Sequence, residues 1–191
     1  LCDGHYFFME KLAGDNFFLI KKDLPEDVIA AINTEIGQIS KALTTVQNAQ
    51  FGFLGEEKRF DSLFPFIRHM LQNLISDAQS RNIDILYDEQ TWMSQLEDDK
   101  SAFETVRNAT LVHWDMWEGN VFVKDGHVSG IIDWERALWG EPFMDDRFRM
   151  HNRGKDFLLG FGQTSFSAEE LKRLRWYDII LYTTMMIEVF Y

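Results

Sequence analysis

The chain has 191 residues, 46% of them hydrophobic, and its 31 acidic and 19 basic residues give a formal net charge of −12. This length and hydrophobic content are enough for one sizeable buried core. The acidic excess disfavours nucleic acids and anionic membranes as partners because both are bound through basic surfaces, and the single cysteine excludes an intrachain disulfide.

Helices are predicted along most of the first half of the chain. Asp23 and Glu26 form a capping pair ahead of apolar residues that recur every three or four positions as far as Val46. The same spacing predicts a second helix over residues 66–81. Residues 88–107 are expected to be helical over part of their length.

Short strands are predicted next, with polar residues at their ends. A strand is expected at 111–112, and β-branched runs at 121–123 and 128–132 flank an Asp-Gly pair, which is a strong hairpin signal. The hairpin folds the chain back on itself. We therefore expect Asp133, after the second strand of the hairpin, to lie beside Asn120, which precedes the first.

His113, Asp115, Asn120 and Asp133 form a pattern suited to phosphoryl transfer. Asp115 precedes Asn120 by five positions and Asp133 by eighteen. Phosphoryl transfer needs a carboxylate that orients the acceptor hydroxyl, and oxygen ligands for the magnesium that bridges the nucleotide phosphates. Amide and carboxylate oxygens suit Mg²⁺, which shares its remaining positions with water and phosphate.

The last predicted helix starts at a capping box, Ser167 with Glu170, and runs to the end of the chain. Asp178 and Glu188 interrupt its apolar stretch, so no membrane span is expected. The first residues lack the basic and apolar regions of a signal peptide. We therefore expect a cytoplasmic protein.

Residues 111–136 resemble the catalytic core of the aminoglycoside phosphotransferase and choline kinase superfamily, which has a protein-kinase-like fold. Members carry H-G-D-x4-N, then a hairpin and a strand that ends in Ile-Asp-Trp or a similar sequence. The resemblance implies that Asp115 is the catalytic aspartate that faces the acceptor hydroxyl. It further implies that Asn120 and Asp133 are the metal ligands and that His113 braces the loop.

The match has departures and an extension. Trp114 stands where the family usually has glycine, and Trp117 before Gly-Asn is similar to the loop of fructosamine kinases. Gly-Glu141-Pro followed by Asp145 is similar to the family's G-D-P-x-x-D, whose last aspartate buttresses the catalytic loop. Glu141 replaces the first aspartate of that motif, and the adjacent Asp146 is an alternative buttress.

Residues 6–14 resemble the hinge strand between the two lobes of such kinases. The resemblance implies that Met9 is the gatekeeper and that the backbone of Glu10 and Leu12 faces the adenine edge. A hinge at this position leaves no room ahead of it for a nucleotide-binding lobe. The chain also contains no G-x-G-x-x-G and no G-x4-G-K-[ST] phosphate loop.

The expected fold is therefore mainly α with a small β-hairpin, an α+β class that corresponds to the C-terminal lobe of a protein-kinase-like fold. Residues 1–14 would be a hinge remnant, and 15–191 a single helical lobe. The lobe would hold the catalytic loop at 111–120 and the metal-binding strand end at 131–135. A missing N-terminal lobe of the same protein is the implied partner.

The predicted function is ATP- and Mg²⁺-dependent phosphorylation of a small-molecule hydroxyl group, with the isolated lobe inactive. The acidic charge favours a cationic acceptor. Candidate acceptor contacts are Trp134, Glu135, Trp139 and acidic groups on the last helix. Two alternatives stay open: a non-catalytic, pseudokinase-type binding module, and a metal-dependent phosphate-ester hydrolase that uses Asp115 and Asp133.

Overall fold

The computed structural model describes residues 10–190, so the predicted gatekeeper Met9 lies outside the described residues. The α-helices are α1 (Phe17–Ile20), α2 (Glu26–Leu43), α3 (Leu63–Ser80), α4 (Glu89–Asp98), α5 (Lys100–Phe103), α6 (Lys155–Phe161) and α7 (Ala168–Glu188). The strands are β1 (Asp15–Asn16), β2 (Gln47–Asn48), β3 (Gly52–Phe53), β4 (Ala109–Val112), β5 (Val121–Lys124), β6 (His127–Ile131) and β7 (Leu138–Gly140). The short 3-10 helices are η1 (Lys21–Asp23), η2 (Glu118–Asn120), η3 (Trp134–Arg136), η4 (Pro142–Met144) and η5 (Asp146–Phe148).

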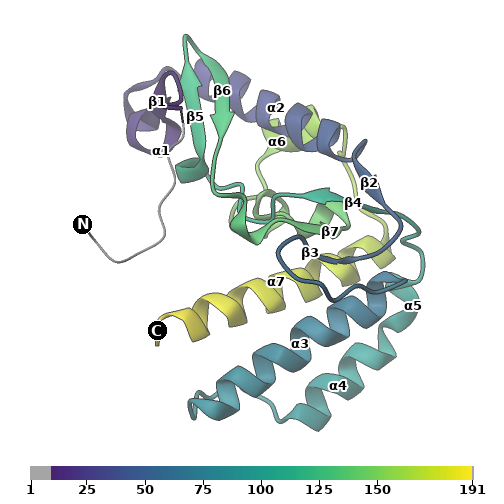
Figure 1. The fold of residues 1–191 in the computed structure, drawn as a ribbon. Coiled ribbons are helices and arrows are strands. Elements are labelled where there is room, and N and C mark those ends of the chain that lie inside the picture. The colour runs from purple at the N-terminus through teal and green to yellow at the C-terminus, as the bar shows by residue number, and fades with distance from the viewer. Residues whose placement is uncertain (1–9, 191) are drawn as a thin grey trace.

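The molecule has two parts, and the predicted α+β class with mainly helical content is confirmed. One part holds both sheets together with α2 and α6, and the other is a layer of helices formed by α3, α4 and α7 (Figure 1). A continuous hydrophobic core joins the two parts, since buried residues of the sheets and of both groups of helices belong to one cluster.

Helix α2 packs closely on α6. An added Cβ at Gly37 of α2 would lie 2.2 Å from the carbonyl oxygen of Phe157 in α6. An added Cβ at Gly160 of α6 would lie 1.9 Å from the carbonyl oxygen of Thr34 in α2. The two backbones therefore approach one another at positions where only glycine fits.

The predicted cap of α2 is wrong. The N-cap residue is Pro25, with φ −60° and ψ 148°, and no side chain caps the helix. Asp23 instead ends the preceding helix η1. The extended backbone of Pro25 separates the two helices, so Asp23 and Glu26 are not the ends of one capping box.

The helices of the helical layer agree more closely with the predictions from the sequence. The second predicted helix, α3, begins at Leu63, three residues before the predicted start. The region predicted at 88–107 divides into α4 and α5 at Asp99. The capping box of α7 is confirmed: the Glu170 carboxylate accepts the Ser167 N–H at 2.7 Å, and the Ser167 hydroxyl accepts the Glu170 N–H at 3.2 Å. Within residues 10–190, no helix is both long enough and apolar enough to cross a membrane.

Two small antiparallel sheets frame the predicted catalytic loop. The first, in the order β1-β5-β6, contains the predicted hairpin. Its turn residues Asp125 and Gly126 both have positive φ, 53° and 82°, as a two-residue type I′ turn requires. The second sheet, in the order β2-β4-β7-β3, is not predicted beyond the strand at β4. Strands β2 and β3 are only two residues long and give no periodic signal.

Candidate active site

The loop after β4 places Asp115 on the wall of a cavity of about 580 Å³. The preceding residue, Trp114, has a left-handed backbone with φ 71°, and its buried ring lies 5.5 Å from the ring of Phe53. Such a backbone favours glycine and is costly for a bulky residue unless surrounding contacts hold it. Trp114 therefore keeps the backbone conformation that suits the glycine expected from the resemblance.

Residues 145–147 hold this loop on both sides of Asp115. The Trp114 N–H donates to Oδ2 of Asp145 at 3.0 Å, and the Trp114 carbonyl accepts the N–H of Asp146 at 3.0 Å. On the other side, Nε of Arg147 donates to the Met116 carbonyl at 2.8 Å. Three consecutive residues thus fix the two chain neighbours of Asp115.

This clamp is itself buried. Burial raises the pKa of Asp145 to about 7, although the backbone N–H groups of Arg147 and Trp114 act in the opposite direction. The Arg147 side chain also reaches α2, where Nη1 donates to Oδ1 of Asn33 at 3.3 Å. Its Nη2 has no hydrogen-bond partner in the described part of the chain. The clamp therefore ties the loop to the α2 scaffold at the cost of one unsatisfied buried donor.

His113 connects the loop to the end of the hairpin. Its Nδ1 accepts the N–H of Asp115 at 3.3 Å, so Nε2 carries the proton and donates to the Ile132 carbonyl at 2.8 Å. Burial lowers the pKa of His113 below its ordinary value, which keeps the ring neutral. Both ring nitrogens of His113 therefore form hydrogen bonds to backbone groups, as expected for a residue that braces the loop.

The backbone segments that carry Asn120 and Asp133 lie side by side at the open end of the hairpin. The Ile132 N–H donates to the Asn120 carbonyl at 3.0 Å, which places the two chain segments side by side. Nδ2 of Asn120 donates to the Asp115 carbonyl at 2.8 Å, so Oδ1 is the atom left for a ligand. Asp133 has a left-handed backbone with φ 65°, is exposed, and raises the pKa of Asp115 through its charge.

The donor set of Asn120 and Asp133 fits Mg²⁺ better than Zn²⁺. Residues 10–190 contain no cluster of three or more His, Cys, Asp or Glu side chains that could enclose a metal ion. A structural or catalytic zinc site needs three or four such ligands. Mg²⁺ instead binds through one or two protein oxygens and completes its octahedron with water and phosphate.

The cavity beside Asp115 is lined from several elements. They are the segment 18–21, the loop 115–118, η3, the segment 146–152 and the end of α7. The lining residues are Phe18, Lys21, Asp115, Trp117, Glu118, Arg136, Asp146, His151, Asn152, Leu181, Met185 and Glu188. Lys21 pairs with Glu118, and Arg136 pairs with Glu188 at 2.6 Å. The carboxylates of Asp115 and Asp146 remain in excess over these cations.

We expect Asp115 to titrate near pH 6 in the metal-free protein. Burial raises its pKa from an ordinary 3.8 to about 6, and the Arg136 guanidinium limits this rise. The folded state therefore holds a proton that the unfolded chain releases between about pH 4 and pH 6, so this ionisation lowers stability as pH rises through that window. Carbon-detected NMR titration should show that the pKa of Asp115 is higher in Arg136→Gln than in the wild-type protein, because the guanidinium that lowers it is gone.

The matched control for this titration is Lys124→Gln, which removes a cation from the exposed hairpin end. It should leave the Asp115 titration unchanged. An Asp115 midpoint near pH 4 in the wild-type protein would contradict the proposed burial of the carboxylate.

The structure gives the predicted acceptor residues other contacts. Trp134, Glu135 and Trp139 do not line the cavity that holds Asp115. The Trp134 ring lies edge-on to His113 at 4.5 Å, Glu135 is exposed in η3, and Trp139 packs against the core from β7. The predicted acidic group on the last helix does reach the cavity, as Glu188.

The predicted hinge residues lie ahead of the first sheet. Glu10 is exposed, and an added Cβ at Gly130 of β6 would lie 2.7 Å from Cδ1 of Leu12, so Leu12 lies against the hairpin. Their part in adenine binding stays a prediction. No sequence pattern pointed to Phe18, Arg136, Leu181 or Met185, because only the fold brings them to Asp115.

Taken together, the helical layer, the hairpin and the clamped loop define an α+β fold of the protein-kinase-like class. The model of the phosphotransferase enzyme family matches residues 2–146, which is 145 of the 191 residues. The chain belongs to this phosphotransferase enzyme family. A search of curated proteins found no match.

Solved aminoglycoside phosphotransferases share the fold. The apo form of a thermostable mutant of APH(4)-Ia is 19% identical with a TM-score of 0.61, over 93% of this chain and 62% of that one. The ternary complex of that mutant (N202A) with AMP-PNP and hygromycin B is 20% identical with a TM-score of 0.61, over 87% and 60%. The streptomycin-ATP-APH(2")-IIa ternary complex is 15% identical with a TM-score of 0.51, over 94% and 68%. The chain thus spans about three fifths of the length of APH(4)-Ia.

Proposed function

We propose that this protein transfers a phosphoryl group from ATP to a hydroxyl group of a small molecule. The observation that carries the proposal is the loop geometry. The Asp115 carboxylate lines a cavity while both of its chain neighbours are clamped, and a backbone hydrogen bond from Ile132 to Asn120 brings the segment of Asp133 alongside Asn120. In phosphoryl transfer, such positioning and charge stabilisation supply most of the rate enhancement.

Each residue of the proposed site has its own role. Asp115 accepts a hydrogen bond from the acceptor hydroxyl, orients its oxygen and takes its proton. Asn120 Oδ1 and the Asp133 carboxylate would hold Mg²⁺, and the ion would supply charge neutralisation at the nucleotide phosphates. His113 and Asp145 act as structural supports, since each holds loop backbone through hydrogen bonds.

The acceptor is a cationic hydroxyl compound. Asp115, Glu118, Asp146 and Glu188 outnumber the lysine and the arginine of the cavity, Lys21 and Arg136, and this excess of negative charge attracts an ammonium group. Phe18 and Trp117, whose rings lie 5.4 Å apart, add an aromatic wall that suits a cation. Hygromycin B and streptomycin in the related structures are consistent with this class of acceptor.

The nucleotide site needs more than the described residues. The sequence contains no glycine-rich phosphate loop, and the chain corresponds to about three fifths of APH(4)-Ia. We place residues 1–14 at the hinge and 15–191 in a helical C-terminal lobe, and an N-terminal lobe of the same protein completes the ATP site. A cytoplasmic location, where ATP is available, is part of the proposal.

The test is magnesium-dependent turnover of the full-length protein with ATP and a panel of aminoglycosides and simpler amino alcohols. ADP release should require an acceptor. Asp133→Asn should raise the Mg²⁺ concentration needed for half-maximal rate by at least roughly tenfold, because it removes a charged ligand. Asp125→Asn makes the same chemical change at the exposed hairpin turn and should leave the requirement unchanged.

Two outcomes would favour the alternatives. Binding of magnesium nucleotide with no transfer to any acceptor would favour a pseudokinase-type module. ATP-independent release of phosphate from simple esters would favour a hydrolase. An unaltered Mg²⁺ requirement in Asp133→Asn would contradict the proposed metal site.

A further inference from the structure

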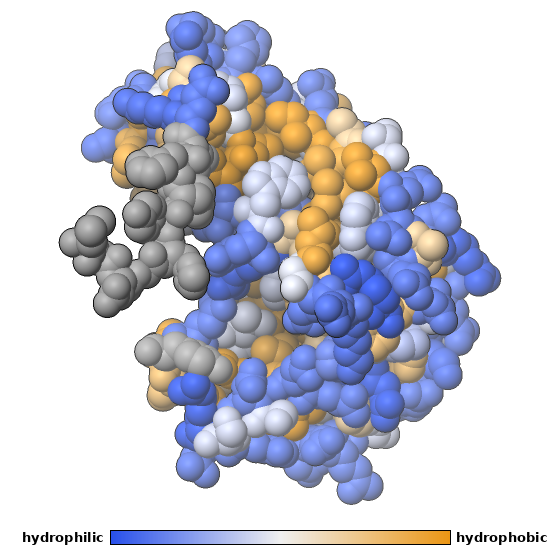
Figure 2. Space-filling view, viewed as in Figure 1, coloured by the Kyte–Doolittle hydropathy of each residue, from blue (hydrophilic) through white to orange (hydrophobic). Residues whose placement is uncertain are grey.

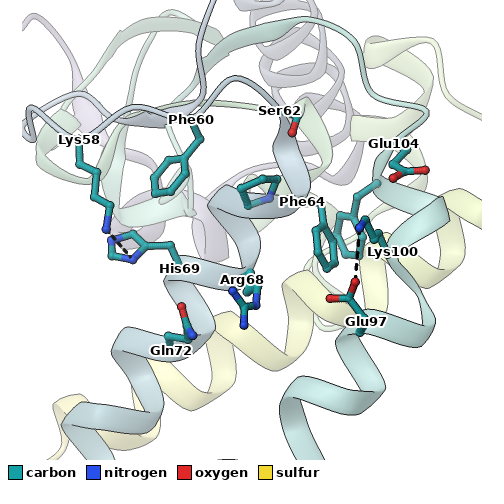
Figure 3. A pocket seen from close by; sticks show the side chains of 12 residues that line it. Lys58, Phe60, Ser62, Phe64, Arg68, His69, Gln72, Glu97, Lys100 and Glu104 are labelled. Atoms are coloured by element: carbon teal, nitrogen blue, oxygen red, sulfur yellow. Dashed lines mark hydrogen bonds and ion pairs between the residues drawn. The ribbon is translucent and has the colours of Figure 1, made fainter.

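A second cavity lies away from Asp115, where the first turns of α3 face α5 and the segment between β3 and α3 (Figure 3). Its volume is about 600 Å³. The lining residues are Lys58, Phe60, Ser62, Phe64, Pro65, Arg68, His69, Gln72, Glu97, Lys100, Phe103 and Glu104. None of them lines the cavity that holds Asp115, so the two cavities are separate.

Cations outnumber carboxylates in this cavity. Lys58, Arg68 and Lys100 face Glu97 and Glu104, a positive balance in a chain whose net charge is −12. Only one close pair joins them: Lys100 to Glu97 at 3.4 Å, between two exposed side chains. The Arg68 guanidinium forms no ion pair within the described residues, so its planar set of donors is available to a ligand.

Aromatic rings position two of the cations. The Lys58 ammonium lies 5.5 Å from the centre of the Phe60 ring, and the Lys100 ammonium lies 5.3 Å from that of Phe64. Lys58 also donates a hydrogen bond to Nδ1 of His69 at 3.3 Å. In Figure 3, Lys58 and Lys100 stand on opposite sides of the cavity and Arg68 lies between them.

We propose that this cavity binds a small ligand that carries two or more phosphate or carboxylate groups. Three cations spread over one concave surface match an extended polyvalent anion better than a single monovalent one. Arg68 binds one oxyanion group through a bidentate contact, and the two lysines act as flanking point charges. The site is independent of the phosphoryl-transfer proposal, because it shares no residue with that site.

The experiment uses inorganic pyrophosphate as the probe, with the full-length protein in EDTA so that no magnesium complex forms. Backbone NMR shifts should move for residues 58–72 and 97–104 and stay unchanged for the loop 113–120. Arg68→Gln and Lys58→Gln should each weaken binding roughly fivefold to tenfold, the effect of losing one charge-assisted contact. Lys155→Gln removes an exposed lysine on α6 and should not change the affinity.

A parallel titration with citrate distinguishes a phosphate ligand from a carboxylate ligand. Binding of pyrophosphate alone assigns a phosphate ligand, and comparable binding of citrate assigns a polycarboxylate as well. The affinity should fall as NaCl is raised, because exposed charges are screened. Shifts confined to residues outside the cavity, or equal affinity of Arg68→Gln and the wild-type protein, would overturn the proposal.

Discussion

Asp115→Asn should lower turnover of the full-length protein by roughly 10²–10⁴-fold, the contribution typical of a positioned general base. The amide has nearly the same size as the carboxylate, but it cannot take the acceptor proton. The loop should keep its shape because the hydrogen bonds that clamp it come from Trp114, Met116 and residues 145–147. Nucleotide affinity should therefore change little.

The measurement is single-turnover phosphoryl transfer together with titration of nucleotide binding. Asp125→Asn, the same change at the hairpin turn, serves as the matched control and should retain wild-type turnover. Substantial transfer by Asp115→Asn would remove this carboxylate from the mechanism. A parallel loss of nucleotide binding would instead show that the substitution had disturbed the loop.

Arg173→Met should destabilise the protein by roughly 3–5 kcal/mol, the cost of leaving a buried charge without its partner. The Glu141 carboxylate accepts hydrogen bonds from Nε and Nη2 of Arg173 at 2.8 Å and from the Tyr177 hydroxyl at 2.6 Å. Arg173 Nη1 also donates to the Ala102 carbonyl at 2.8 Å. This buried network joins α7 to the loop after β7 and to α5.

Urea unfolding measures the loss of stability, and two further variants test whether this loss comes from the Glu141 network. Glu141→Gln combined with Arg173→Met should be more stable than Arg173→Met alone, because the unpaired charge is gone. Arg175→Met, two residues along α7, removes an exposed arginine paired with Asp99 at 2.6 Å and should cost less than about 1 kcal/mol. Equal losses in the two arginine variants would show that the Glu141 network adds nothing.

The network also has a consequence for the proposed active site. Leu181, Met185 and Glu188 from the second half of α7 line the Asp115 cavity. Figure 2, a space-filling view from the same side as Figure 1, shows hydrophilic and hydrophobic residues next to one another on this face of the molecule. Because α7 is anchored through Arg173, Glu141 helps hold one wall of the cavity without touching it. The glutamate that replaces the family's aspartate thus serves a packing role that depends on a specific arginine.

Local sequence alone determined the elements whose signals lie within a few residues. Asp125-Gly126 specified the hairpin turn, since both residues tolerate positive φ, and Ser167 with Glu170 specified the start of α7. The spacing of His113, Asp115, Asn120 and Asp133 fixed their arrangement, because a single loop and hairpin join them. The same reasoning failed at the start of α2. Pro25 is the N-cap of this helix and Asp23 ends the preceding helix η1, a boundary that the periodic apolar pattern does not show.

Only the tertiary structure decided which distant residues join Asp115. Phe18, Arg136, Asp146 and Glu188 line its cavity from separate elements, and no sequence spacing links them. Likewise, Arg147 reaches the Met116 carbonyl only because the segment after β7 folds back over the loop. Long-range packing sets such contacts, whereas turns and caps depend on backbone preferences of neighbouring residues. The sequence therefore predicted the candidate residues of the loop and its supports His113 and Asp145, whereas the fold determined the cavity and the charge around Asp115.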